Sequence, residues 1–420
     1  MLLRENKFLS KYLSLGWISC IGDALYFIAL MTYAATLENP ALGILIITIS
    51  TTFPSVIGVI LGVLADATKE KTIRIIQSGV FRGLVFIIIA FIIMNTSSLA
   101  GIIAIGFLNA ASDTVGSFSA LVKAPFLRLI VKSEQLEEAI GVDRSIRQSI
   151  DGIAGFFGVL LLGFFGIYYL AFFNALLFFV VSVGFKMLQK KLKEIEGQIT
   201  PPKITCMKDF GGHIKHSVKT LVVIKPLRNF FLILAAANAV LATVIPVFLM
   251  ALTENESAQI INFEFSVTLA KGILLVVAIL AGIVGPKYCK GIGTTMALLL
   301  EMFSVVLFAV AIGAGTVWLA LGFLLINTFS ATMFSIRLST LLQQSVPPET
   351  LGTISGAVGL FLSVIPIPFT IALSSTAAIS LPVYAIAGSV FAAIIILAIL
   401  MLKLDKMDLK NTIGQYGSQS

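Results

Sequence analysis

Long apolar stretches, separated by short polar connections, dominate the hydropathy pattern of this chain. An α-helix rises about 1.5 Å per residue, so roughly 20 apolar residues cross the hydrocarbon core of a bilayer, which is about 30 Å thick. Twelve stretches are long enough: 12–33, 42–65, 73–94, 99–121, 143–164, 167–188, 228–251, 262–285, 293–313, 316–341, 351–374 and 381–403. The pattern predicts an all-α polytopic membrane protein with twelve transmembrane helices.

The amino-acid composition also indicates a lipid environment. Of the 420 residues, 58% are hydrophobic and 12% are charged, whereas about 25% of the residues of a soluble domain are charged. A chain this apolar cannot bury its surface in a water-soluble globule. The first apolar stretch, 12–33, follows a basic start as in a signal peptide. Because it is long enough to span and lacks a small-residue cleavage site, we expect an uncleaved helix.

The positions of Lys and Arg test this topology independently. With both termini in the cytoplasm, the outer connections near 34–41, 95–98, 165–166, 252–261, 314–315 and 375–380 contain no Lys or Arg. All but two of the 29 basic residues then lie on the inner side, and the two exceptions, Arg82 and Lys271, lie within spans. This is the positive-inside pattern of a multi-pass protein of the cell membrane. The net charge of +8 therefore indicates membrane topology, and no nucleic-acid partner is expected.

A basic connector divides the chain into two similar parts. We predict an N-terminal six-helix bundle over 1–188, a cytoplasmic connector with an amphipathic helix over 189–227, a C-terminal six-helix bundle over 228–405 and a cytoplasmic tail over 406–420. Two short matches at nearly the same separation along the chain support a duplication. Gly62-Val-Leu-Ala-Asp66 recurs in part as Gly282-Ile-Val-Gly-Pro286, and Val131-Lys-Ser-Glu-Gln-Leu136 recurs as Val346-Pro-Pro-Glu-Thr-Leu351. Duplicated halves are typical of several transporter folds.

Several kinds of site are not expected. The sequence has no GxxxxGK[ST] motif to hold ATP phosphates. His213 and His216 both lie in the connector, and Cys20, Cys206 and Cys289 are scattered without a CxxC spacing. We therefore predict no enzyme activity, no metal site, no disulfide framework and no cofactor.

Charged residues inside spans are the candidate functional residues, because charges are costly in a membrane. Asp23 lies near the middle of the first span, where it can exchange protons or pair with a cationic substrate. A carboxylate that serves helix packing is the alternative. Asp113 shares a polar face of the fourth span with Ser112 and Thr114, which indicates a water-filled cavity. Asn109 lies on the same segment.

Two cations within spans also need an explanation. Arg82 and Lys271 each lie roughly 14 Å into their spans, so each needs a carboxylate or carbonyl partner or an aqueous cavity. If Lys271 faces a cavity, it favours anionic or zwitterionic cargo. Asp151 and Glu301 are shallower, and we expect structural pairing with Arg147 or a lysine.

Small residues and prolines indicate where helices approach or bend. Gly152, Gly155 and Gly158 recur every third residue in the fifth span, which predicts a packing seam between the two halves. Prolines can kink spans and free carbonyl groups. The candidate kinks are Pro54, Pro246, Pro366 and Pro368.

One motif carries a family resemblance. The segment Gly62-Val-Leu-Ala-Asp66-Ala-Thr-Lys69-Glu-Lys71 resembles the loop between the second and third helices of the major facilitator superfamily. The resemblance implies two pseudo-symmetric six-helix bundles. It also implies a cytoplasmic latch in which Asp66 binds the positive N-terminal end of the eleventh helix, near Leu351-Gly352-Thr353. A plain helix cap at Asp66 is the alternative.

The whole chain further resembles the macrolide-efflux branch of drug–proton antiporters. The segments that carry this resemblance are Ile18-Ser-Cys-Ile-Gly-Asp23, Val131-Lys-Ser-Glu-Gln-Leu136 and Lys406-Met-Asp-Leu-Lys410. Two family features are absent: the fourth-span Arg, where Asn109 and Asp113 lie, and the proline-bearing motif of the fifth span. The resemblance implies a monomeric secondary transporter that exports an amphipathic small molecule against proton flow. Solute uptake or lipid flipping by the same fold is one alternative, and a non-transporting sensor or scaffold is another.

Overall fold

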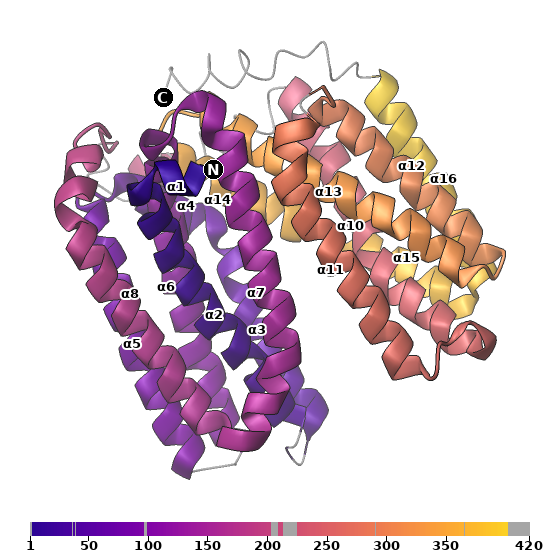
Figure 1. The fold of residues 1–420 in the computed structure, drawn as a ribbon, viewed down its shortest axis with the longest axis horizontal. Coiled ribbons are helices and arrows are strands. Elements are labelled where there is room, and N and C mark those ends of the chain that lie inside the picture. Colours follow the sequence, from indigo (N-terminus) through magenta and orange to yellow (C-terminus); the bar gives the residue numbers. More distant parts are fainter. Residues whose placement is uncertain are drawn as a thin grey trace. The chain divides into compact units, whose positions relative to one another are not determined.

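The structure is a computed structural model that describes residues 2–35, 37, 39–95, 99–202, 209–212, 225–289, 291–364 and 366–401. Within these residues the chain is helical and contains no strand. It divides into two compact units (Figure 1). Unit 1 comprises 1–139, 146–217 and 346–360, and unit 2 comprises 140–145, 218–345 and 361–420.

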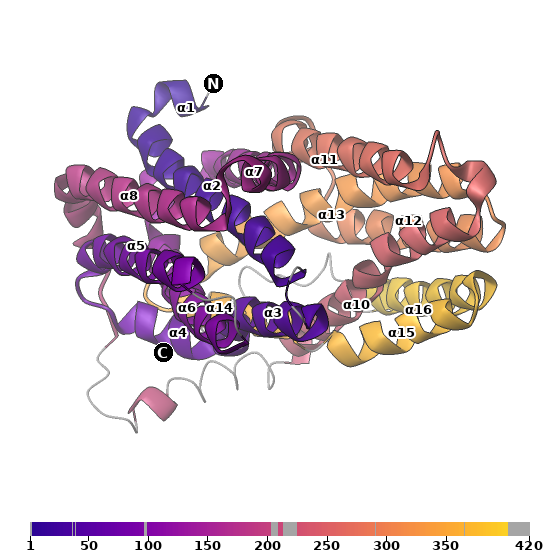
Figure 2. The ribbon, with the colours of Figure 1, turned by 90° about the horizontal axis from the view of Figure 1, so that it is seen from below.

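Unit 1 contains most of the first half of the chain together with one helix from far along it. Its helices are α1 (Leu2–Glu5), α2 (Lys7–Ala35), α3 (Pro40–Val56), α4 (Gly58–Ala67), α5 (Lys71–Asn95), α6 (Leu99–Ile130), most of α7 (Leu136–Phe165), α8 (Ile167–Glu196) and most of α14 (Leu351–Ser363). Figures 1 and 2 show α2, α5 and α8 side by side. Residues 346–360 thus pack with unit 1, although they follow the tenth predicted span.

Unit 2 contains the remaining long helices. They are α10 (Lys225–Glu254), α11 (Phe263–Tyr288), α12 (Thr294–Gly313), α13 (Val317–Ser345), α15 (Ile367–Ile379) and α16 (Leu381–Met401). Helix α12 packs against α10, α13 and α16. Residues 140–145 of α7 also belong to this unit: Gly141 lies against the backbone of Gly282, and the Ser145 hydroxyl donates to the Ile279 carbonyl at 3.0 Å.

Each of the twelve predicted segments falls on helix, so the predicted fold class is confirmed. Ten helices of the described residues are long and apolar enough to cross a membrane, or eleven if the bent pair α3 and α4 is one span. Helix α7, with 30 residues, occupies the remaining predicted segment. Large apolar side chains such as Phe107, Phe164 and Met187 are 77%, 82% and 80% exposed, as expected of helices that face lipid. The chain is a multi-pass membrane protein.

Two of the spans are interrupted, and each interruption is close to a proline. Helices α3 and α4 meet at Ile57 with a bend of 49°, three residues after Pro54. Proline lacks the N–H that would bond to the carbonyl four residues earlier. Helices α14 and α15 are separated by residues 364–366, and Pro366 immediately precedes α15. Pro246 lies inside the continuous helix α10.

The connector is described only in part. Helix α8 extends to Glu196, beyond the predicted end of the sixth span at residue 188. Residues 209–212 are helical, but most of the predicted amphipathic helix lies outside the described residues.

Aromatic packing fixes the interior of unit 1. The rings of Tyr26 and Phe86 meet edge to face, with centroids 4.6 Å apart, and Phe86 lies 5.5 Å from Phe178. These three side chains belong to α2, α5 and α8 and are 2% exposed or less. This aromatic core therefore sets the rotation of the three helices relative to one another. It lies one helical turn from Asp23 on α2 and from Arg82 on α5.

Candidate functional site

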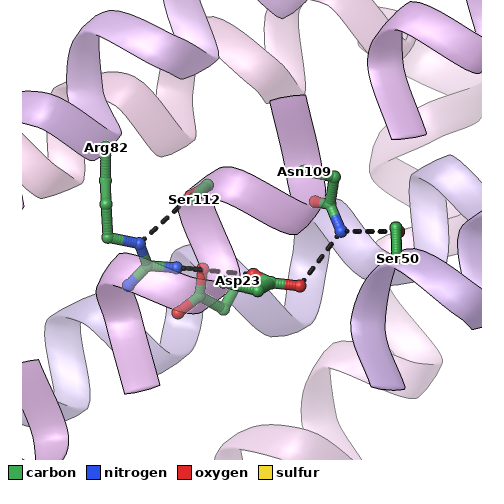
Figure 3. A network of polar contacts seen from close by, with 6 residues as sticks. Asp23, Ser50, Arg82, Asn109 and Ser112 are labelled. Atoms are coloured by element: carbon green, nitrogen blue, oxygen red, sulfur yellow. Dashed lines mark hydrogen bonds and ion pairs between the residues drawn. The ribbon is translucent and has the colours of Figure 1, made fainter. Parts of the chain in front are cut away.

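A buried arginine joins three helices of unit 1. The Nη2 atom of Arg82 on α5 lies 2.8 Å from the Oδ1 atom of Asp23 on α2 and 3.8 Å from Oδ1 of Asp113 on α6. Its Nε donates a hydrogen bond to the Ser112 hydroxyl at 3.1 Å. Figure 3 shows this convergence. The sequence predicted a carboxylate or carbonyl partner or an aqueous cavity for Arg82, and the structure places two carboxyl groups beside its guanidinium group.

The guanidinium group is enclosed by an aromatic ring and two acids. Its central carbon lies 4.0 Å from the centroid of the Phe178 ring, a cation–π geometry. The side chain of Arg82 is 9% exposed, whereas those of Asp23 and Asp113 are 39% and 27% exposed. The cation is thus enclosed between an aromatic face and two acids, and the acids keep partial access to the outside of the unit.

An amide links this group to a fourth helix. Asn109 donates from Nδ2 to Oδ2 of Asp113 at 3.0 Å and to the hydroxyl of Ser50 on α3 at 3.1 Å (Figure 3). Asn109, Ser112 and Asp113 share one face of α6 because they are spaced three and four residues apart. We call Asp23, Ser50, Arg82, Asn109, Ser112 and Asp113 the Arg82 network.

The charges of the Arg82 network do not balance when both acids are ionised. Two carboxylates and one guanidinium leave one negative charge on the network, which a proton or another cation can balance; Lys123 and Arg147 are further cations that interact with Asp23. Two further polar groups lie beside the acids in sequence: the Tyr26 hydroxyl and Thr114 Oγ1 are buried and have no hydrogen-bond partner among the described residues. The arrangement can therefore bind one proton or one positively charged group.

A second polar contact joins α4 to the start of α14 within unit 1. The carboxylate of Asp66 accepts hydrogen bonds from the backbone N–H groups of Gly352 and Thr353, at 2.8 and 2.7 Å, and from the Thr353 hydroxyl at 2.5 Å. Asp66 is 2% exposed. These N–H groups lie in the first turn of α14, where a helix leaves donors unpaired and carries partial positive charge. We call this the Asp66 contact.

Glycines allow the Asp66 contact to form. A Cβ atom on Gly62 would lie 2.4 Å from the Gly352 carbonyl oxygen, and one on Gly356 would lie 2.1 Å from that of Gly58. The backbones of α4 and α14 are therefore in contact at two positions, about one helical turn apart. Gly62 and Gly352 were predicted from the sequence, whereas Gly58 and Gly356 were not. The four-residue spacing in each helix, typical of close helix pairs, is the signal that would have identified them.

Lys71 and Glu196 extend the Asp66 contact. Lys71 is 2% exposed, and its Nζ donates to the carbonyl oxygens of Ala65 and Asp66, at 2.5 and 3.2 Å. Glu196, at the end of α8, accepts from the backbone N–H groups of Lys71 and Thr72 at the start of α5. Sequence analysis did not select Glu196, because it lies far from Lys71 along the chain. The side chain of Lys69 is exposed.

Other predicted site residues make no hydrogen bond or ion pair with either group that the structure shows. Asp151 on α7 is exposed and accepts a weak contact from the Cys20 thiol at 3.8 Å. Lys271 on α11 is exposed, in unit 2. Gly152 is half-buried, and the surroundings of Gly155 and Gly158 lie outside the described residues, so the seam stays a prediction. No group of three or more potential metal ligands occurs among the residues that the structure describes.

Comparison with known proteins places the fold. No family model matches the sequence, and no curated protein matches it. Among solved structures, a bacterial homologue of the iron transporter ferroportin, in an outward-facing state with soaked iron, is 15% identical, with a TM-score of 0.70 over 94% of this chain and 99% of that one.

Two other solved structures are similar. The human organic anion transporter MFSD10 (TETRAN) is 12% identical, with a TM-score of 0.64 over 94% of this chain and 99% of that one. The major facilitator superfamily proton:xylose symporter XylE is 11% identical, with a TM-score of 0.65 over 95% of this chain and 96% of that one. The chain thus has the major facilitator fold.

Proposed function

We propose that this protein is a secondary active transporter of the cell membrane that exports an amphipathic small molecule in exchange for protons. Its fold is that of several proteins whose names describe transport. The observation that carries the proposal is the Arg82 network, in which one guanidinium group lies between two partly exposed carboxyl groups inside membrane-length helices. Ionisable groups at that depth are costly unless they serve a function.

Proton exchange follows from the geometry of the Arg82 network. Asp23 is closer to the guanidinium group, at 2.8 Å against 3.8 Å, so its ionised form is the better stabilised of the two. Asp113 accepts a hydrogen bond from the neutral amide of Asn109 and carries the exchangeable proton. When Asp113 is protonated the network is neutral. When it loses the proton, the negative charge attracts a positively charged part of the cargo.

The proposed transport is tested with everted membrane vesicles that contain the protein. A lipophilic cationic drug is added to energised vesicles, and the internal pH is followed. Export coupled to protons moves the drug into the everted vesicles and protons out of them, so the internal pH rises only when both the protein and the drug are present. Drug accumulation without any protein-dependent proton movement would exclude proton coupling, and the absence of both would exclude export of that drug.

We further propose that the Asp66 contact is a latch that must open during each transport cycle. Helix α14 begins the eleventh predicted span, in the second half of the chain, but its first turn packs on α4 in unit 1. An anion at a partly buried helix N-terminus contributes up to about 2 kcal/mol. Alternating access would require this contact to open.

Asp66→Asn is expected to slow transport and leave substrate binding intact. The amide removes the negative charge that faces the α14 N-terminus and so destabilises the latched state. Initial transport rates and the substrate Kd are measured on the same preparation. Glu70→Gln, a change at an exposed carboxylate four residues away, is the matched control. An Asp66→Asn protein that transports at the wild-type rate contradicts the latch.

A second candidate function is uptake of anionic or zwitterionic solutes, or flipping of lipids, by the same fold. The observation that favours it is Lys271, a cation within α11 whose side chain is exposed. On this alternative, Lys271→Gln reduces transport of an acidic amphiphile, whereas Lys287→Gln, in the last turn of the same helix, does not. If Lys271→Gln leaves acidic and cationic amphiphiles equally unaffected, this alternative is wrong.

A further inference from the structure

Unit 2 contains a buried carboxyl group that the Arg82 network does not include. Glu301 lies on α12 and is 2% exposed, and its Oε2 atom has no hydrogen-bond partner among the described residues. It is the only glutamate that is buried in the described part of the chain. We expected Glu301 to pair with Arg147 or a lysine, and no such ion pair occurs among these residues. The expected pairing of Glu301 is therefore wrong.

The helices around Glu301 offer no nearby cation. Helix α16 has no charged residue, and the charges of α10 lie at its two ends. The one charged residue of α13 lies ten residues beyond Asn327, which is about 15 Å along the helix, and its guanidinium group donates to the Cys289 carbonyl at 2.5 Å. The charged residues of these three helices are Lys225, Arg228, Glu254 and Arg337.

An internal repeat relates the position of Glu301 to that of Arg82. Asn109, Ser112 and Thr114 on α6 recur on α13 as Asn327, Ser330 and Thr332, all three at the same separation along the chain. Glu301 follows Arg82 at almost that separation. The two asparagines and the two serines are all buried. The sequence thus places Glu301 in unit 2 where Arg82 lies in unit 1.

In both units a polar contact joins the two helices of the repeat, although through different atoms. In unit 1 the side chain of Arg82 bonds to Ser112, and in unit 2 the Asn327 amide donates to the backbone carbonyl of Glu301 at 3.2 Å. The position of Asp113 is taken by Ala331. Unit 2 thus has the acid Glu301 where unit 1 has the cation Arg82. It has no counterpart of the acid Asp113 on α6.

We infer that Glu301 is a second proton-binding site, which holds its proton at neutral pH. An isolated carboxylate in a dry interior is strongly unfavourable, and a carboxyl group in that position binds a proton and becomes neutral. This site does not depend on proton-coupled export: it requires only that the carboxyl group is buried without a counter-ion.

Infrared spectroscopy of the full-length protein in lipid bilayers tests the inference. Glutamate labelled with ¹³C at the side-chain carboxyl group shifts the carbonyl band of a protonated glutamic acid and leaves aspartic acid bands in place. The expected result at pH 7 is a label-sensitive acid band in the wild type that is lost in Glu301→Gln and kept in Glu254→Gln, whose carboxyl group is exposed. The labelled wild type alone is informative if the variant does not fold. Absence of a label-sensitive acid band at pH 7 overturns the inference.

Thermal unfolding gives a second readout. Gln has the shape of a protonated Glu, so Glu301→Gln is expected to unfold near the wild-type temperature at about pH 4, where the glutamate is protonated in both the folded and the unfolded chain. As the pH rises above this value, the unfolded wild-type chain releases the proton that the folded chain still holds, so the wild-type unfolding temperature falls below that of Glu301→Gln. If instead the variant is less stable than the wild type by the same amount at every pH, Glu301 is ionised or structurally paired, and the inference is wrong.

Discussion

Asp113→Asn is expected to abolish proton-driven transport and to weaken, without abolishing, the binding of a cationic substrate, which still equilibrates across the membrane at a raised concentration. Asn has the shape of protonated Asp113 but cannot release a proton, so the Arg82 network stays neutral throughout the cycle. Proton-driven accumulation in vesicles is therefore expected to fall by about tenfold or more, which corresponds to a loss of about 1.4 kcal/mol or more in coupling. Counterflow of labelled substrate, which needs no proton gradient, is expected to persist.

The matched control for this change is Asp151→Asn. Asp151 is also an acid within a span of unit 1, but it is exposed and contacts the Cys20 thiol instead of Arg82. It should retain proton-driven accumulation. If Asp151→Asn loses accumulation and Asp113→Asn keeps it, the exchangeable proton has been placed on the wrong residue.

Arg82→Met is expected to have the largest effect on stability. Met retains much of the side-chain volume beside Phe178 but leaves Asp23 and Asp113 without their cation. Removing one member of a buried ion pair lowers the free energy of unfolding by about 3–5 kcal/mol. We expect a loss of about 3 kcal/mol, because both carboxyl groups are partly exposed. The free energy of unfolding in mild detergent gives the measurement.

Arg74→Met is the control for Arg82→Met, because Arg74 is exposed on the same helix and bonds only to the side chain of Gln77 among the described residues. Exposed polar contacts contribute about 0–1 kcal/mol. The double change of Asp23 and Asp113 to Asn in the Arg82→Met background should recover much of the lost stability, since it removes the unpaired charges. Equal destabilisation by Arg74→Met and Arg82→Met would contradict the assigned role of the network.

Much of the fold followed from the sequence because hydrophobic length and charge placement are strong signals in membrane proteins. The twelve apolar stretches all lie on helices, and the break near Pro366 lies at a predicted kink. The position of the bend at Ile57 was harder to predict, because it lies three residues after Pro54, the predicted kink.

The candidate site was predicted only in part. Asp23, Arg82 and Asp113 stood out because charges within spans are rare, but nothing in a single sequence gives the rotation of one helix against another. Their pairing depends on packing in the aromatic core that contains Tyr26, Phe86 and Phe178. The same limit applied to Glu301, for which a partner was expected and none lies among the described residues. The α14 end of the Asp66 contact was located by family resemblance, whereas Gly58 and Gly356 required the close approach of two backbones.

Proton release from the purified protein on binding of a cationic substrate tests the central proposal most directly. In weakly buffered solution at neutral pH, a saturating amount of substrate is added and the released protons are counted against the substrate that is bound. The Arg82 network predicts about one proton per bound substrate for the wild type and none for Asp113→Asn. Substrate binding to the wild type without proton release, or equal release from Asp113→Asn, would contradict the proposal that this carboxyl group exchanges its proton for cargo.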